Sequence, residues 1–133
     1  MTVGLVIVSH SPKIAEGVVE LAEQMAEEVR VLAAGGTDDG EIGTSATRIA
    51  DAVSAADSGD GVLVLVDLGS AVISTRMAID ELLSDELRGR VRISEGPVVE
   101  GAVIGAVQAS TGSSLDEVAT AAAGAATLPK VKD

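Results

Sequence analysis

The chain lacks several residue types that common functional sites require. Its 133 residues include no cysteine, phenylalanine, tyrosine or tryptophan, and only one histidine. The absence of cysteine excludes a disulfide framework and a thiolate metal site. The absence of aromatic rings leaves no side chain on which a nucleobase could stack. The core must therefore be built from aliphatic side chains.

Basic residues are also few. Nine Lys and Arg stand against 21 Asp and Glu, which gives a net charge of −12 at pH 7. This charge repels phosphate backbones, so we expect no nucleic-acid binding.

The N-terminal apolar run over residues 3–8 is too short to cross a bilayer and follows no basic segment, so we expect a soluble cytoplasmic protein without membrane contact. With one histidine and no cysteine, we expect no metal site.

Short apolar runs alternate with helical patterns along the chain. Four runs are typical of buried parallel strands, at residues 3–8, 29–33, 61–66 and 90–93. Five helices are predicted between and after these runs. The first two cover residues 13–28 and about 44–56, and the third starts at about residue 70. The fourth starts after Gly96-Pro97, and the fifth starts at a capping box formed by Ser114 and Glu117. We expect one domain over residues 1–133, with an unstructured tail over 128–133.

Two of the predicted helices carry patterns that bear on packing. From the first helix onward, Ile14, Val18, Leu21, Met25 and Val29 form an apolar stripe that we expect to face the core. In the fourth, Gly101 and Gly105 lie four residues apart and would allow close packing.

Alternating strands and helices predict an α/β fold, an open and mainly parallel sheet with helices on both faces. The economical strand order is 2-1-3-4, which places the switch point between strands one and three. Ligands gather at such a point, at the carboxyl ends of the strands. His10 follows strand one and Asp67 follows strand three, so we expect these two side chains to face each other.

His10 is the candidate reactive group, because an imidazole titrates near neutral pH and can act as a nucleophile. Asp67 could accept a hydrogen bond from one imidazole nitrogen and leave the other nitrogen free to react. Its alternative role is to cap the third helix or a turn. Helix N-termini near His10 would stabilise a phosphate group. Hydroxyl groups that could assist lie on Ser11, Thr37, Thr44 and Ser70.

Two common nucleotide-binding motifs are absent. The chain has neither the P-loop pattern nor a G-x-G-x-x-G turn after its first strand, so we expect no tight nucleotide binding. The turn over residues 35–45 is rich in glycine and acid, and we expect it to shape a docking face. The acidic residues Asp38, Asp39, Glu41 and Glu95 could steer a basic partner towards that face.

Four segments taken in order resemble a known family over essentially the whole chain. They are residues 4–11, residues 35–40 with 43–45, residues 67–71 and residues 97–102. The chain resembles the phosphotransfer subunit of phosphoenolpyruvate-dependent dihydroxyacetone kinase, which is related to the IIA domain of mannose-type sugar phosphotransferase systems. The turn Asp67-Leu68-Gly69-Ser70-Ala71 favours the kinase branch, since it lacks the Gly-Gly-Ser-Pro of mannose-type transporters.

The resemblance implies a relay of phosphoryl groups in a homodimer. A histidine-containing phosphocarrier protein would phosphorylate His10, and the group would pass to Mg-ADP held in a separate nucleotide-binding subunit. That subunit phosphorylates dihydroxyacetone bound to a third subunit. In this interpretation Asp67 orients His10, and the phosphate contacts come from Ser11, Thr37, Gly69 and Ser70. No cofactor is expected in this chain itself.

Three other interpretations remain open from the residues. The chain could be the IIA component of a mannose-type sugar transporter. It could be a receiver domain phosphorylated on Asp67, with Ser94 after strand four, although the paired acids after strand one and the lysine after a fifth strand are missing. It could also be a binding module without catalytic activity that holds a nucleotide at the strand edge.

Overall fold

The protein is built on a four-stranded parallel sheet, seen here in a computed structural model that describes residues 1–131. The strands are β1 (Gly4–Ser9), β2 (Val31–Gly35), β3 (Val62–Val66) and β4 (Val91–Ile93). Their order across the sheet is β2-β1-β3-β4, with every pairing parallel. The predicted fold class and strand order are confirmed, and the strand ends shift by at most two residues.

Helices connect the strands. They are α1 (Pro12–Met25), α2 (Ala46–Ala56), α3 (Gly69–Met77), the π-helix η1 (Ala78–Leu82), α4 (Asp85–Arg88), α5 (Val98–Ser110), α6 (Leu115–Gly124) and the 3-10 helix η2 (Ala125–Thr127). The helix predicted from about residue 70, with Ile79 and Leu83 facing inward, continues beyond α3 as η1, and both residues pack in the core. The sequence did not predict α4. Residues 128–131 form no helix or strand, as predicted for the tail, and residues 132–133 lie outside the described residues. Within residues 1–131, no helix is long and apolar enough to cross a membrane.

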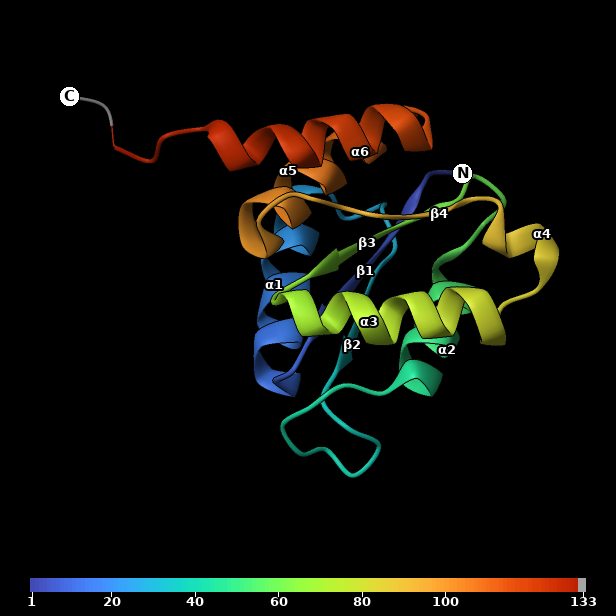
Figure 1. Ribbon diagram of the computed structural model, residues 1–133. Helices are drawn as coiled ribbons and strands as arrows, with labels where there is room; N and C mark the ends of the chain where they lie inside the picture. The colour runs from blue at the N-terminus through green and yellow to red at the C-terminus, as the bar shows by residue number, and fades with distance from the viewer. Residues whose placement is uncertain (132–133) are drawn as a thin grey trace.

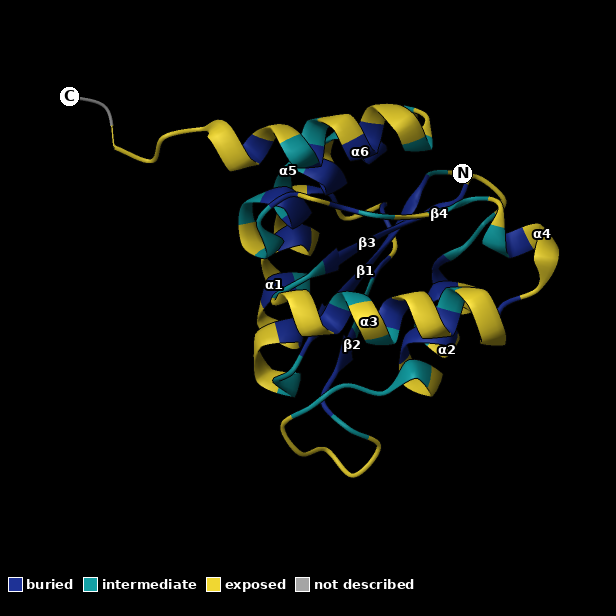
Figure 2. Ribbon diagram, in the orientation of Figure 1, coloured by how far each residue is buried: buried dark blue, intermediate teal, exposed yellow. Residues whose placement is uncertain are grey.

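The sheet lies between two layers of helices (Figure 1). Because strand side chains alternate between faces, one face packs against α1, α5 and α6 through Leu5, Ile7, Leu63 and Leu65. The other face packs against α2, α3 and α4 through Val6, Val8, Val62 and Val64. Figure 2 shows the central strands buried and the outer faces of the helices exposed. The two central strands, β1 and β3, are therefore fixed from both sides.

The apolar stripe predicted for the first helix mostly faces outward, so that prediction was wrong. Ile14, Leu21 and Met25 are 49%, 52% and 61% exposed, whereas Val18 on α1 and Val29 beyond its end are buried. The buried face is completed by Ala15 and Ala22. The helix lies so close to the sheet that a Cβ atom on Gly35 would fall 2.8 Å from the Cβ of Ala15. Small side chains therefore fill this face.

The close packing predicted for Gly101 and Gly105 is confirmed. A Cβ atom at Gly101 would lie 2.8 Å from Cδ2 of Leu65, and one at Gly105 would lie 3.4 Å from Cδ2 of Leu5. These leucines belong to β3 and β1. The two glycines thus bring α5 directly onto the pair of strands whose carboxyl ends carry His10 and Asp67.

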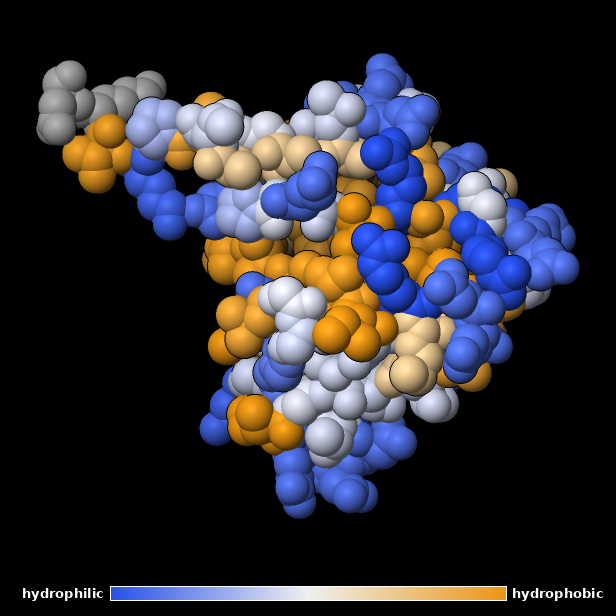
Figure 3. Space-filling view, in the orientation of Figure 1, coloured by the Kyte–Doolittle hydropathy of each residue, from blue (hydrophilic) through white to orange (hydrophobic). Residues whose placement is uncertain are grey.

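The edge strand β4 is less covered than the central strands. Its residues Val91 and Ile93 are half-buried, and on neighbouring α3 Ile73 and Met77 are 68% and 50% exposed. Apolar atoms gather on this face between α3 and α6 (Figure 3). The helix layers therefore leave apolar surface open along the β4 edge.

A partly buried ion pair lies at the amino-terminal edge of the sheet. Asp57, at the C-terminus of α2, has an 11% exposed side chain that lies 2.7 Å from Nη2 of Arg90, just before β4. Its Oδ1 also accepts the N–H groups of Gly59 and Gly61 at 3.1 and 3.2 Å. The hydrogen bonds from Arg90 are the main cause that holds the pKa of Asp57 below its ordinary value of 3.8.

We predict that Asp57→Asn lowers the free energy of unfolding by about 2 kcal/mol at pH 7, because it removes charge-assisted hydrogen bonds without changing the side-chain size. The folded-state pKa of Asp57 is lowered, so its stabilising contribution is complete above 3.8 and is lost as the pH falls below that value. Urea denaturation of both proteins at several pH values measures the difference. The control is Asp60→Asn, an exposed acid in the same turn. Equal losses in both variants would contradict the prediction.

Candidate active site

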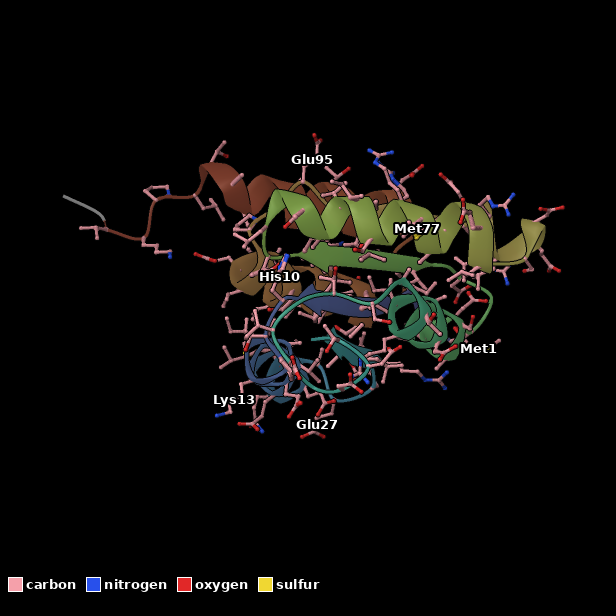
Figure 4. All side chains as sticks on the ribbon, turned by 60° about the horizontal axis from the view of Figure 1, so that its bottom comes forward. Met1, His10, Lys13, Glu27, Met77 and Glu95 are labelled. Carbon is pink, nitrogen blue, oxygen red and sulfur yellow. The ribbon has the colours of Figure 1, made fainter. Side chains whose placement is uncertain are left out.

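The ends of β1 and β3 bring the candidate residues together. Val8 pairs with Val66, and the N–H of Asp67 donates to the carbonyl of Val8 at 3.1 Å, one residue beyond the strand. His10 and Asp67 therefore follow neighbouring strands at the same edge of the sheet. Figure 4 shows His10 at this edge, beside the start of α3. The predicted juxtaposition at the switch point is confirmed.

One imidazole nitrogen of His10 is bound to Asp67. Nδ1 lies 3.0 Å from Oδ1 and 3.3 Å from Oδ2 of the carboxylate. An ionised carboxylate can only accept hydrogen bonds, so Nδ1 must carry the proton. The side chain of His10 is 23% exposed and that of Asp67 is 12% exposed. The contact is thus partly shielded from water and orients the ring.

The other imidazole nitrogen is bound to a hydroxyl group. Oγ of Ser70, in the first turn of α3, lies 2.8 Å from Nε2. With the proton on Nδ1, Nε2 has a free lone pair, so the Ser70 hydroxyl is the donor. The arrangement leaves Nε2 as the basic and nucleophilic atom of the ring.

The Asp67 carboxylate accepts hydrogen bonds from four donors. Oδ2 accepts the hydroxyl of Ser9 and the backbone N–H of His10, each at 3.0 Å. Oδ1 accepts the N–H of Leu68 at 2.7 Å as well as Nδ1–H. Burial alone would raise the pKa of Asp67, but these hydrogen bonds together hold it below its ordinary value of 3.8. The carboxylate is therefore ionised at neutral pH.

The alternative role of Asp67 as a cap of the third helix is met only in part. The N-cap residue of α3 is Leu68, and it makes no side-chain capping bond. Asp67 accepts the N–H of that residue, but it also accepts hydrogen bonds from Ser9 and His10. The carboxylate is thus directed mainly at the end of β1.

Of the four predicted phosphate contacts, Ser70 alone bonds His10 within the described residues. Ser11 caps α1, with its hydroxyl accepting the N–H of Ile14 at 3.3 Å. The hydroxyl of Thr37 accepts the N–H of Glu41 at 3.2 Å inside its own loop. Gly69 is the exposed first residue of α3, with open space where a Cβ would lie. Their role towards phosphate stays a prediction.

The loop between β2 and α2 rests against the site. The N–H of Gly43 donates to the carbonyl of His10 at 2.8 Å, and Oγ1 of Thr44 lies 2.6 Å from Oγ of Ser74 on α3. These two hydrogen bonds were not predicted from the sequence. Asp38, Asp39 and Glu41 are exposed on this loop. The loop is therefore fixed to the edge of the sheet that carries His10, and its acidic side chains are exposed.

The site is an open edge and holds no cluster of metal ligands. A surface hollow lined by Glu23, Glu27 and Arg30 lies beside β2 at the opposite, amino-terminal edge and contains none of the site residues. Within residues 1–131, no group of three or more His, Asp or Glu side chains is arranged to hold a metal ion. The reactive group at this edge is therefore the oriented imidazole of His10.

Comparison with known proteins identifies a family. The family model of the PTS system fructose IIA component, EIIA-man, matches residues 4–119. The PEP-dependent dihydroxyacetone kinase phosphoryl donor subunit DhaM of Escherichia coli K12 is 42% identical over 120 residues, which cover 87% of this chain and 25% of that protein. The chain thus spans about a quarter of the length of that relative.

Shorter relatives match almost end to end. The phosphoryl donor subunit DhaM of dihydroxyacetone kinase 2 of Listeria innocua is 38% identical over 117 residues, which cover 87% of this chain and 93% of that protein. A crystal structure titled as that of the unknown function protein EF1359 superposes with a TM-score of 0.87 at 34% identity, covering 99% of this chain and 100% of that one. The chain therefore belongs to the EIIA-man family of PTS system fructose IIA components, and groups there with the DhaM phosphoryl donor subunits.

Proposed function

We propose that this chain is the phosphoryl donor subunit of a phosphoenolpyruvate-dependent dihydroxyacetone kinase, and that it acts in the cytoplasm as a phosphohistidine relay. The observation that carries the proposal is the ring of His10, whose Nδ1 is held by Asp67 at 3.0 Å while Nε2 faces a hydroxyl at 2.8 Å. Such a ring is oriented for nucleophilic attack through Nε2. The names of the DhaM relatives connect the relay to dihydroxyacetone kinase.

In the first transfer, the lone pair of Nε2 attacks the phosphorus atom of a phosphohistidine on a histidine-containing phosphocarrier protein. A P–N bond to His10 forms as the P–N bond of the carrier breaks. The His10 ring gains positive charge as this happens, and the ionised carboxylate of Asp67 stabilises that charge through Nδ1–H.

In the second transfer, an oxygen of the terminal phosphate of Mg-ADP attacks the phosphorus atom on His10. The P–Nε2 bond breaks and the neutral imidazole returns. We place the Mg-ADP in a separate nucleotide-binding subunit, which then phosphorylates dihydroxyacetone on a third subunit. This chain has to position the phosphoryl group and stabilise the charge that develops during transfer, as in phosphoryl transfer generally.

Two helices begin close to His10 and Asp67. Helix α1 begins at Pro12 and α3 begins at Gly69, each within two residues of His10 or Asp67. The first N–H groups of a helix have no partner inside the helix, and the helix dipole favours an anion there. The Leu68 side chain cannot accept the first amides of α3. We therefore assign the phosphate contacts to the start of α3, with Gly69 and Ser70, assisted by Ser11 and Thr37.

The alternatives receive less support. Phosphorylation of Asp67 would have to break several of the hydrogen bonds that its two oxygens accept. A sugar-transporter IIA component would use the same site, but the relatives' names favour the kinase. The homodimer implied by the resemblance belongs to the proposal too, since a second subunit would bury the exposed apolar side chains of Ile14, Leu21 and Met25.

The first prediction concerns the phosphorylated atom. His10→Ala should abolish labelling of the chain by phosphoenolpyruvate, enzyme I and the carrier protein, because no other imidazole is present. The label on the wild-type protein should survive alkali and be lost in acid, which separates phosphohistidine from an acyl phosphate. Circular dichroism should show that the variant is folded. A label that persists in the folded variant would move the site to Asp67 or a serine.

The second prediction concerns the tautomer. Asp67→Asn should slow phosphoryl transfer by about 100-fold or more, because an amide can present its NH₂ group to Nδ1 and so favour the proton on Nε2. Nitrogen-15 NMR of the imidazole should show Nδ1–H in the neutral wild-type ring and a loss of that form in the variant. The control Asp60→Asn removes the same charge from an exposed turn at the opposite, amino-terminal edge of the sheet and should transfer normally. Unchanged transfer and tautomer in Asp67→Asn would reduce Asp67 to a turn residue.

The third prediction separates a relay from a nucleotide-binding module. We expect no micromolar binding of ADP or ATP by this chain, because it has no P-loop, no aromatic side chain and a net charge of −12. Isothermal titration calorimetry with Mg-ADP measures this directly, with the nucleotide-binding subunit as the positive control. Micromolar affinity in the isolated chain would favour the binding module.

A further inference from the structure

The last residue of β1 is a polar side chain in an otherwise apolar strand. Ser9 is 0% exposed and follows five buried residues of the strand. Burial of a hydroxyl group is costly unless the group forms hydrogen bonds. The hydrogen-bond partners of Ser9 therefore indicate its role.

The Ser9 hydroxyl connects the Asp67 carboxylate to the start of α1. Oγ accepts the backbone N–H of Ser11 at 3.0 Å, and its own hydrogen is donated to Oδ2 of Asp67 at 3.0 Å. Since the hydroxyl has one hydrogen, that hydrogen is committed to the carboxylate. Ser9 thus fixes Oδ2, and Oδ1 is left facing Nδ1 of His10 at 3.0 Å.

We propose that Ser9 is a positioning residue for phosphoryl transfer, whose hydroxyl holds the Asp67 carboxylate in the orientation that presents Oδ1 to the His10 ring. The proposal rests on the relay function proposed above. It adds a residue that touches neither the phosphoryl group nor the imidazole side chain and acts only through Asp67.

The geometry explains why the hydroxyl is needed. Both carboxylate oxygens lie near Nδ1, at 3.0 and 3.3 Å, so a free carboxylate could exchange one oxygen for the other. The backbone N–H of His10 also donates to Oδ2, but it belongs to the residue that Asp67 has to orient. Ser9 supplies a donor from the rigid end of the buried strand. Its hydrogen bond is also one of those that lower the pKa of Asp67.

The chain contains a matched control for this role. Ser94 follows β4, is 6% exposed, and its Oγ accepts the N–H of Gly96 at 3.0 Å. This is the same turn, two residues long, that Ser9 forms with Ser11. Ser94 forms no hydrogen bond with a carboxylate among residues 1–131. Ser94→Ala therefore removes the turn contact alone, whereas Ser9→Ala removes the turn contact and the bond to Asp67.

The test compares Ser9→Ala and Ser94→Ala in the full chain. We expect Ser9→Ala to slow phosphoryl transfer from the carrier to His10 by about tenfold, the effect of roughly one charge-assisted hydrogen bond. Ser94→Ala should slow it by less than about twofold. Carbon-13 NMR titration of the Asp67 carboxyl should show a higher midpoint in Ser9→Ala and an unchanged midpoint in Ser94→Ala. Urea denaturation gives the stability of each variant, and Ser9→Cys, which keeps the side-chain volume with a weak donor, should repeat the Ser9→Ala result.

Each outcome decides the proposal. A folded Ser9→Ala or Ser9→Cys variant with wild-type transfer and an unchanged Asp67 titration would overturn it. Equal slowing by Ser9→Ala and Ser94→Ala would also overturn it, because the turn contact would then explain the effect. If the wild-type chain takes no label on His10, the relay function is wrong, and the Asp67 titration still shows whether Ser9 positions the carboxylate.

Discussion

The hydrogen bond between Asp67 and His10 depends on how β1 and β3 pair. The two residues are 57 positions apart in sequence and meet because the strands are parallel neighbours in the register Val8 to Val66. A shift of that register by one residue would turn the Asp67 side chain to the other face of the sheet. The aliphatic side chains that both helix layers bury on β1 and β3 set this register. The chemistry at the edge therefore depends on the core beneath it.

The donors around Asp67 are fixed before any substrate arrives. Two of them are backbone N–H groups, from His10 at the end of β1 and from Leu68 at the start of α3. Such donors stabilise an ionised carboxylate that burial would otherwise protonate, and they need no rearrangement during the reaction. The ring of His10 is then held between this carboxylate and Ser70. The orientation of the imidazole is thus a property of the folded chain.

The sequence predicted the features that rest on simple periodicity and order. Four apolar runs and their alternation with helices led to the strand order, and the strand order placed His10 beside Asp67. The outward face of α1 was not predictable in this way, because Ile14 and Leu21 match a core stripe and only the close approach of Gly35 shows that alanines fill the space. The role of Ser9 was hidden for a similar reason, since a strand-end serine has no pattern that names its partner.

The exposure of the site fits the work of a relay. A phosphoryl carrier has to be reached in turn by a donor protein and an acceptor subunit, and each must bring its own phosphate or nucleotide to Nε2. A deep cleft would exclude one of them, whereas His10 lies at an open edge with a 23% exposed side chain. The buried part of the pair is Asp67, at 12% exposure. The structure thus separates the two demands: the ring that reacts is partly exposed, and the carboxylate that fixes its lone pair is more shielded from water.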